Sequence, residues 1–597
     1  MRYQRYPKRN NRIFCLVKVI FGILTPPIEI IMTYAVLTQD DIVGMIPVIG
    51  LLLFKAVAFY KFLAFVWKSL SSLYVRANKP KPQEHDNQHL NSTPHVGGPT
   101  TNNLEYHLPS IVFLLLLSYL LEPLSTMFHL RGYRISNPRD HGLHDLVHGV
   151  DPALQDVLAK TPSLMRGPRP PILFHNRHLQ FIPWLIQNEL HRVEGIPFQR
   201  LELEVSACVD KTHGTDHCER SPLMTDTVTL DVFPPFDDGN SNTSLYEGFH
   251  AGSPIVLFSP GLRCYSQDMP GNMIIRRLYG EGFRSVVVNR RGHTPGQKLK
   301  APRWNLFGDV DDLEQVYWHV QQEWAAPHTA FFLHGISSGT SVVVSALAEY
   351  DRRQLALEQQ AEQSSLSLLS SMSSENGTTI PLHLATIMPR KAPSFVASIS
   401  ITPGYDISKV FLPERFKYPY NPLLLDGVKA HFIRDNEKVL RAFDSEAVDA
   451  ALAASNLQEL LDASAVFAGY SNATDYYVGE NPVNWMHLVT TPTLVLNAID
   501  DPCCHVHNIY EESPYPQHQG KSYARLIDES LHSILAVTKS GTHCPFLDSS
   551  PSTFSLLPAF IRDPLYGGWM LDSWADRVSV EFYKAALEVY EDRRFIQ

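Results

Sequence analysis

Short apolar runs rich in Val, Ile, Leu and Phe alternate with stretches of helical periodicity from about residue 172 onward. The later runs are apolar at nearly every position, as expected of parallel strands that are covered on both faces. Strands that alternate with helices predict a doubly wound α/β sheet, mostly parallel, with helices on both faces. Eight strands are expected, at residues 198–205, 227–233, 254–258, 284–289, 329–333, 395–402, 492–497 and 533–538.

Two segments interrupt this alternation. Residues 358–379 are of low complexity, and we expect a surface insertion there. Residues 403–490 separate the sixth and seventh predicted strands and are long enough to form a helical cap over the ends of the strands. The cap contains the aromatic run Phe416-Lys417-Tyr418-Pro419-Tyr420, which suits the lining of an acyl-chain pocket.

The chain before this region is dominated by apolar stretches. Residues 13–37 and 42–67 are each long enough to span a bilayer, and we assign residues 1–76 to an N-terminal helical membrane anchor. A polar linker follows at 77–107, and a third apolar, membrane-associated segment at 108–135. The catalytic domain is expected at 172–595.

Basic residues flank the first two apolar stretches on both sides and also follow the third. The positive-inside rule therefore places the catalytic domain in the cytosol. Separately, we expect the membrane to be an endomembrane such as the endoplasmic reticulum. Charged residues and prolines interrupt the first two stretches, so the number of spans stays open. In this orientation the sequons at Asn242, Asn376 and Asn472 are expected to remain unglycosylated.

Composition narrows the classes of function. Hydrophobic residues make up 44% of the chain and charged residues 19%, which is typical of a globular protein. The net charge of −10 and the lack of a basic stripe argue against a nucleic-acid partner. Seven unevenly spaced cysteines do not make a disulfide framework. No obligate protein partner is evident.

The segment Gly335-Ile336-Ser337-Ser338-Gly339 follows an apolar strand and precedes a helical stretch. This G-x-S-x-G pattern in a strand–turn–helix setting is a nucleophile elbow. Its glycines allow a turn so sharp that side chains would collide with the neighbouring strand and helix. The pattern predicts Ser337 as a catalytic nucleophile.

A serine hydroxyl needs a histidine to take its proton and a carboxylate to orient that histidine. Two later predicted strands end in suitable residues, the adjacent Asp500 and Asp501 after one and His543 after the other. We predict Asp501 as the acid of the triad and Asp500 as a turn or supporting residue, with the reverse assignment left open.

The oxyanion hole requires two backbone N–H groups. One is expected from Ser338, the residue after the nucleophile. The other is expected from the loop that follows the strand at 254–258, and we assign it to Leu262.

Several further motifs give the chain a family resemblance. The segment His175–Gln180 resembles the N-x-H-L-Q motif of the YheT-like, ABHD-type subfamily of serine esterases with the α/β-hydrolase fold. Matching motifs are Pro260-Gly261-Leu262, Asn289-Arg290-Arg291-Gly292, Thr474-Asp475-Tyr476-Tyr477, Asp500-Asp501-Pro502 and His543-x-x-Phe546. The resemblance covers residues 172–595. It implies an N-terminal membrane anchor and hydrolysis of lipid esters such as acylglycerols or phospholipids.

The chain departs from this family in two loops. Arg263-Cys264-Tyr265 stands where the family usually has Thr-Gly-Gly, and Thr542 and Pro545 replace two glycines around His543. These changes alter the oxyanion loop and the acyl pocket but leave the triad intact. Two other functions stay open, a non-catalytic membrane protein that binds lipid or acts as a scaffold, and an acyltransferase that uses the same triad.

Two Cys/His clusters resemble metal sites. The first comprises Cys208, His213, His217 and Cys218, and the second Cys503, Cys504, His505 and His507. The spacing of the first is irregular for zinc. The second belongs to a loop beside the active site, and ester hydrolysis by a serine needs no metal. We expect neither a metal nor a cofactor.

Overall fold

The structure is a computed structural model that describes residues 142–149, 151–168, 177, 180–181, 196–208, 220–236, 249–266, 272–372, 392–416, 420–548 and 572–594. All of these belong to one compact unit, Tyr106–Gln597. The predicted anchor at 1–76, the linker at 77–107 and the third apolar segment at 108–135 lie outside the described residues. Within the described ranges, no helix is both long and apolar enough to cross a bilayer.

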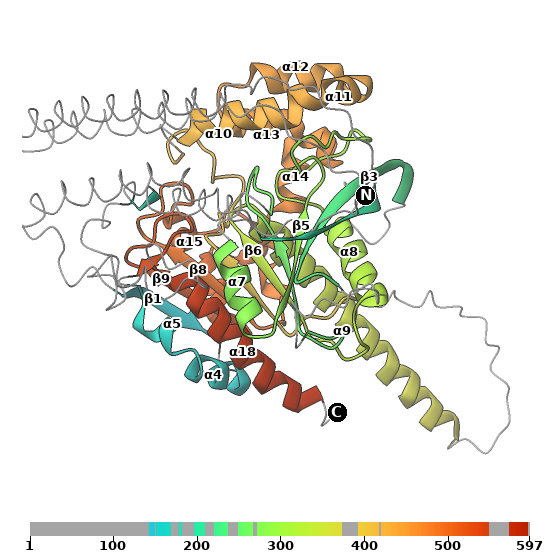
Figure 1. The fold of residues 1–597 in the computed structure, drawn as a ribbon, viewed down its shortest axis with the longest axis vertical. Coiled ribbons are helices and arrows are strands. Elements are labelled where there is room, and N and C mark those ends of the chain that lie inside the picture. Colours follow the sequence, from blue (N-terminus) through green and yellow to red (C-terminus); the bar gives the residue numbers. More distant parts are fainter. Residues whose placement is uncertain are drawn as a thin grey trace, which may run out of the picture. The chain divides into compact units, whose positions relative to one another are not determined.

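A sheet with the strand order β1-β9-β8-β7-β6-β4-β5-β3-β2 forms the centre of the unit (Figure 1). Its strands are β1 (Leu143–His148), β2 (Gln199–Cys208), β3 (Arg220–Phe233), β4 (Ile255–Ser259), β5 (Arg284–Asn289), β6 (Phe331–Ile336), β7 (Ala397–Ile401), β8 (Thr493–Ala498) and β9 (Ser533–Thr538). Neighbours from β5 through β9 pair in parallel, whereas β3 runs antiparallel to both β2 and β5. The predicted α/β sheet is therefore confirmed.

The prediction of eight strands was incomplete, because the sheet has a ninth. Strand β1 pairs antiparallel with β9 at the edge of the sheet, before residue 172, where we had placed the start of the domain. Its sequence, LHDLVH, is only partly buried and contains no apolar run. An edge strand is covered less than a central one, so it lacks the hydrophobic signal on which the prediction relied.

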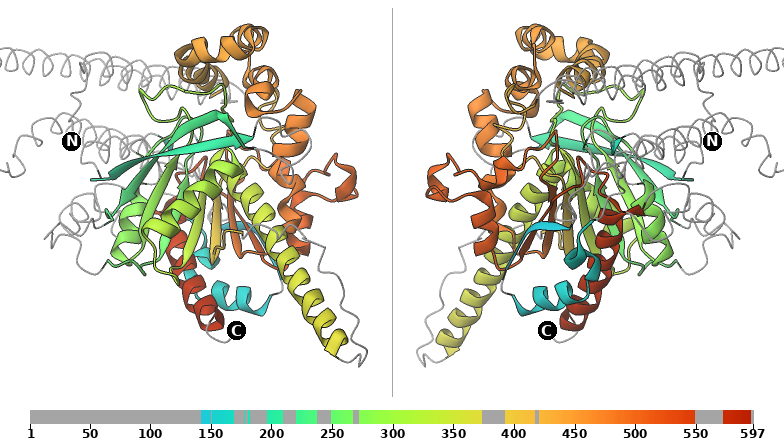
Figure 2. Two further views of the ribbon diagram at one scale, coloured as in Figure 1. Left: turned by 90° about the vertical axis from the view of Figure 1, so that its right-hand side faces the viewer. Right: turned by 90° about the vertical axis from the view of Figure 1, so that its left-hand side faces the viewer.

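Helices cover both faces of the sheet. One buried apolar cluster joins one face to α4 (Pro152–Ala159), α7 (Asn272–Gly280) and α18 (Trp574–Arg594). A second joins the other face to α8 (Val310–Glu323), α9 (Gly339–Met372) and α16 (Tyr523–Glu529). Figure 2 shows α18 in red and α9 in yellow on opposite sides of the sheet.

Helix α9 follows the predicted nucleophile and extends well beyond the sheet (Figure 2). It reaches Met372, so residues 358–372 of the predicted surface insertion are helical and continue α9. The segment contains Gln, Glu and Leu, which favour helix, but serine is its commonest residue. Composition alone could not separate a polar helix from an irregular loop.

A set of short helices lies between β7 and β8, within the predicted cap at 403–490. They are α10 (Tyr420–Val428), α11 (Glu437–Phe443), α12 (Ser445–Ala453), α13 (Leu457–Ser464) and α14 (Ala473–Glu480). Their apolar side chains form a third buried cluster, against which Leu262 after β4 and Cys503 after β8 also pack. The cap helices therefore cover the carboxyl ends of the parallel strands (Figure 1).

Candidate active site

Ser337 lies at the turn between β6 and α9, and its φ of 53° is positive. Few residues other than glycine adopt this conformation. The glycines on either side allow the turn because it has no room for a Cβ atom. A Cβ at Gly335 would lie 2.7 Å from the Cα of Thr340, and one at Gly339 would lie 2.1 Å from the carbonyl oxygen of Ser259. The elbow therefore presents Ser337 at the carboxyl edge of the sheet.

The structure brings the three predicted triad residues together. The Nε2 of His543 lies 2.9 Å from the Oγ of Ser337, and its Nδ1 lies 2.8 Å from Oδ2 of Asp501. Ser337, Asp501 and His543 are brought to this edge by β6, β8 and β9. The geometry suits proton transfer from the serine to the imidazole, with the carboxylate holding the imidazole in place.

Asp501 is buried, and the loop after β8 orients its carboxylate. The other oxygen, Oδ1, accepts hydrogen bonds from the backbone N–H groups of Cys503 (2.7 Å) and Cys504 (2.8 Å). Cys503 and Cys504 thus contribute their backbone to the site. Burial raises the pKa of the Cys503 thiol well above its ordinary value and that of Cys504 to about 11, so both thiols are neutral at pH 7.

Asp500, the alternative acid, lies in a different environment. Its Oδ1 accepts hydrogen bonds from the backbone N–H groups of Gly541 (2.9 Å) and Thr542 (2.8 Å), just before His543. Its Oδ2 accepts from Gln180 and from Ser540. The structure thus places Asp501 on the imidazole and Asp500 on the loop that carries it. Gln180, the last residue of the N-x-H-L-Q motif, is buried and also contacts this loop.

The electrostatics of the site favour a basic imidazole. Burial by itself would lower the pKa of His543, but the carboxylate of Asp501 raises it, and the resulting pKa lies well above the ordinary value. The imidazole is therefore better able to take a proton from Ser337 than an isolated histidine.

The two predicted oxyanion residues lie beside the nucleophile. Gly261, which precedes Leu262, packs so closely that a Cβ there would lie 3.2 Å from the Cβ of Ser337. The backbone N–H groups of Leu262 and Ser338 donate no hydrogen bond to any residue that the structure describes. Two donors are thus available next to the serine, as an oxyanion hole requires.

Both loops in which the chain departs from the resembled family are strained. Arg263 has a φ of 57° and Thr542 a φ of 50°. Thr542 stands where the family usually has glycine, and a β-branched residue seldom adopts this conformation. Such strain is common where the surrounding structure holds a functional site in place.

Sequence reasoning did not assign a role to the residues that support the oxyanion loop. The buried Asp231 accepts hydrogen bonds from Ser266, at the far end of the loop, and from Asn289. Asn289 in turn accepts from the backbone N–H of Ser266 at 2.9 Å. Arg290 contacts the near end of the loop at Pro260 and Gly261. Asn289 and Arg290 belong to a motif that had been noted only as a family resemblance.

The aromatic run predicted for the cap is only partly described, since residues 417–419 lie outside the described ranges. Phe416 is buried in the apolar cluster of the cap, with its ring packed against Phe411. It is therefore part of the cap's own core. Tyr420 begins α10, with its ring 6.5 Å from that of Phe416.

The described residues offer one set of ligand-type side chains at the site. Atoms of Asp501, Cys504 and His543 lie within 4.8 Å of one another. Both nitrogens of His543 are already hydrogen-bonded, to Asp501 and to Ser337, so a metal here would displace the serine or the carboxylate. Of the other predicted cluster, Cys208 ends β2, and His213, His217 and Cys218 lie outside the described residues.

Comparison with known proteins identifies relatives. No protein-family model matches the chain. The chain is 22% identical over 368 residues to the zebrafish (Danio rerio) protein named monoacylglycerol lipase ABHD2, covering 60% of this chain and 68% of that one. It is 25% identical over 279 residues to the mouse (Mus musculus) protein named phospholipase ABHD3, covering 46% of this chain and 55% of the relative. Among solved structures, puromycin hydrolase covers 66% of this chain and 40% of its own, with 11% identity and a TM-score of 0.30.

The two sequence relatives, named ABHD2 and ABHD3, agree with the family that the motifs suggested. The strand order around the β6–Ser337–α9 elbow is that of the α/β-hydrolase fold. The sequence relatives named ABHD2 and ABHD3 thus support an α/β-hydrolase of the ABHD type that hydrolyses carboxylic esters.

Proposed function

We propose that the protein hydrolyses carboxylic esters of lipids through a Ser337–His543–Asp501 triad and an acyl-enzyme. The observation that carries the proposal is the continuous hydrogen-bonded chain from the Oγ of Ser337 through His543 to Asp501. Next to it, the N–H groups of Leu262 and Ser338 are available as oxyanion donors.

In this mechanism the Oγ of Ser337 attacks the ester carbonyl carbon while its proton passes to Nε2 of His543. The carbonyl oxygen becomes an oxyanion, which accepts hydrogen bonds from Leu262 and Ser338. When the carbon–oxygen bond to the leaving alcohol breaks, His543 returns the proton to that alcohol. A water molecule then gives a proton to His543 while its oxygen attacks the acyl carbonyl carbon. The bond to the Oγ of Ser337 breaks, His543 returns the proton to that oxygen, and the fatty acid leaves.

The proposed substrates are acylglycerols or phospholipids. The relatives named above as a monoacylglycerol lipase and a phospholipase support this class. The cap adds physical support, because its apolar core continues to Leu262 in the oxyanion loop. An acyl chain near the serine would therefore meet apolar surface.

The substrate class can be tested with the purified full-length chain in mixed micelles. The chain should release fatty acid from monoacylglycerol or from phosphatidylcholine of the same acyl length. In water labelled with ¹⁸O, the released acid should carry the label, because water resolves the acyl-enzyme.

The same assay separates the alternatives. Transfer of the acyl group to added glycerol or lysophospholipid, without labelled acid, would show an acyltransferase. Lipid binding with no product from either substrate would support a non-catalytic scaffold and contradict the proposal.

We also propose that the apolar stretches at 13–37 and 42–67 and the segment at 108–135 attach the enzyme to an endomembrane, with the catalytic domain in the cytosol. The basic residues that flank them support this orientation. A lipid that partitions into the bilayer would then reach the cap without crossing water.

Protease added to sealed microsomes should digest the catalytic domain, and Asn242, Asn376 and Asn472 should carry no glycan. A lumenal marker protein in the same vesicles serves as the control and should stay intact. Protection of the domain together with an endoglycosidase-sensitive mass shift would instead place it in the lumen.

A further inference from the structure

Arg290, directly after β5, is buried, with 7% of its surface exposed. Its Nη1 donates a hydrogen bond to the carbonyl oxygen of Leu306 at 2.9 Å. Its Nη2 lies 3.0 Å from the carbonyl oxygen of Pro260, 3.2 Å from that of Gly261 and 3.2 Å from the Oγ of Ser338. One guanidinium nitrogen thus contacts both segments that supply the predicted oxyanion donors.

Among the residues that the structure describes, Arg290 forms no ion pair with a carboxylate, and its guanidinium donates hydrogen bonds only to neutral oxygens. The neighbouring buried arginines differ, because Arg291 pairs with Asp312 and Arg303 with Asp309. Burial lowers the pKa of Arg290 to about 10, which leaves it charged at neutral pH. The carboxylate of Asp309 attracts this charge but forms no direct ion pair with it. A buried cation without a direct ion pair is costly, which suggests a use for its charge.

The geometry of the peptide unit connects this contact to the oxyanion hole. A trans peptide is planar, so the carbonyl of Gly261 and the N–H of Leu262 point in opposite directions. When Arg290 holds the carbonyl on one side, the N–H is turned to the other side. A hydrogen bond from a cation to the carbonyl also polarises the peptide and strengthens the N–H as a donor.

The second donor is linked to the same group. The N–H of Ser338 belongs to the residue whose hydroxyl contacts Arg290. The two segments also touch directly, because a Cβ at Gly339 would meet the carbonyl oxygens of Ser259 and Pro260. The distance between the two donors is therefore set by contacts that include Arg290.

We propose that Arg290 is the positioning residue of the oxyanion hole. It aligns the N–H groups of Leu262 and Ser338 and places a positive charge behind the developing oxyanion. The inference rests on the proposed function and adds to it the residue that preorganises the transition-state site.

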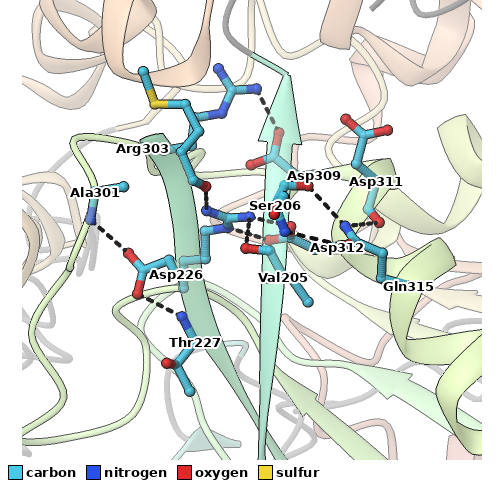
Figure 3. A network of polar contacts seen from close by, with 12 residues as sticks. Val205, Ser206, Asp226, Thr227, Ala301, Arg303, Asp309, Asp311, Asp312 and Gln315 are labelled. Carbon is cyan, nitrogen blue, oxygen red and sulfur yellow. Dashed lines mark hydrogen bonds and ion pairs between the residues drawn. The ribbon is translucent and has the colours of Figure 1, made fainter. Parts of the chain in front are cut away.

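Arg291 offers a matched control because it is the same residue type at the next position and is also buried. Its guanidinium pairs with Asp312 at 2.6 Å and donates to the carbonyl oxygens of Met224 and Val205. Figure 3 shows Val205 and Asp312 in the network that joins the β2 and β3 strands to α8. These contacts hold the sheet to a helix and involve no predicted oxyanion residue.

The test compares Arg290→Met, Arg290→Lys and Arg291→Lys in the full-length chain with a short-chain p-nitrophenyl ester. Arg290→Met keeps the bulk but loses the charge and the donors, so kcat should fall about 100-fold, as for loss of an oxyanion donor. KM should change less than about threefold, because the donors act mainly on the transition state. Affinity for a trifluoromethyl ketone, which forms a tetrahedral adduct, should fall in parallel with kcat.

Arg290→Lys keeps a charge and some donors, so it should recover about tenfold in kcat over Arg290→Met. Arg291→Lys should lower the melting temperature but leave kcat and the inhibitor affinity of the folded protein within about threefold of wild type. If Arg290→Met does not fold, the test rests on Arg290→Lys alone. This variant should lose about tenfold in kcat and in inhibitor affinity relative to wild type.

The inference is wrong if either folded Arg290 variant keeps wild-type kcat and inhibitor affinity, or if Arg291→Lys loses both to the same extent. A wild-type chain that hydrolyses no ester and whose Ser337 is not labelled by a fluorophosphonate would refute the proposed function itself, and this inference with it.

Discussion

Replacement of Ser337 by alanine is expected to reduce ester hydrolysis by about 10⁵- to 10⁶-fold. The Oγ of Ser337 lies 2.9 Å from Nε2 of His543. Without this oxygen the site has no nucleophile that could form the acyl-enzyme. A fluorophosphonate probe should label the wild type and fail to label Ser337→Ala. The measurement is in-gel fluorescence of the labelled protein, combined with the rate of fatty-acid release.

A serine close in sequence provides the control. Ser341 is buried in the first turns of α9, and its hydroxyl has no part in the proposed mechanism. Ser341→Ala should keep both labelling and most of the activity. Labelling that persists in Ser337→Ala would assign the nucleophile to another residue.

Replacement of Asp501 by asparagine is expected to reduce kcat by about 10⁴-fold. The carboxylate accepts from His543 at 2.8 Å, and an amide in its place can hold the imidazole in the wrong tautomer. Asp500→Asn should keep activity within about tenfold of wild type, because its remaining oxygen can still accept from Gly541 and Thr542. Activity that survives in Asp501→Asn but not in Asp500→Asn would reverse the two roles.

The pH dependence gives a second readout for the same pair. His543 acts as a base only when it is neutral, so kcat/KM falls as the pH drops through its pKa. Asp501 raises this pKa, so the acid limb of the wild-type pH–rate profile should have its midpoint above the ordinary pKa of histidine. In Asp501→Asn the limb of the residual activity should move to lower pH, whereas in Asp500→Asn it should move much less.

Much of the fold was predictable because its signal is local. The central strands β4, β6, β7, β8 and β9 are buried at every position, and such strands appear in the sequence as apolar runs. The edge strand β1 was missed for the opposite reason, because half-covered polar residues leave no run. The extension of α9 through a low-complexity segment was missed because polar helices and polar loops share a composition.

The candidate triad could be predicted because its members follow buried strands in a fixed order. Sequence alone favoured Asp501 but left Asp500 open, since both are acidic and follow the same strand. The choice depends on which carboxylate the loop after β8 turns toward His543. In the structure the backbone N–H groups of Cys503 and Cys504 hold Asp501 there, while Asp500 is engaged by the His543 loop.

The same limit applies to the arginines after β5. The sequence by itself determined where the central strands lie along the chain, the elbow at Ser337 and the loops that carry Asp501 and His543. Only the tertiary structure separated Arg290 from Arg291, one on the oxyanion loop and the other on Asp312. Successive side chains at a strand end point in different directions, so the partner of each depends on which distant segments pack there.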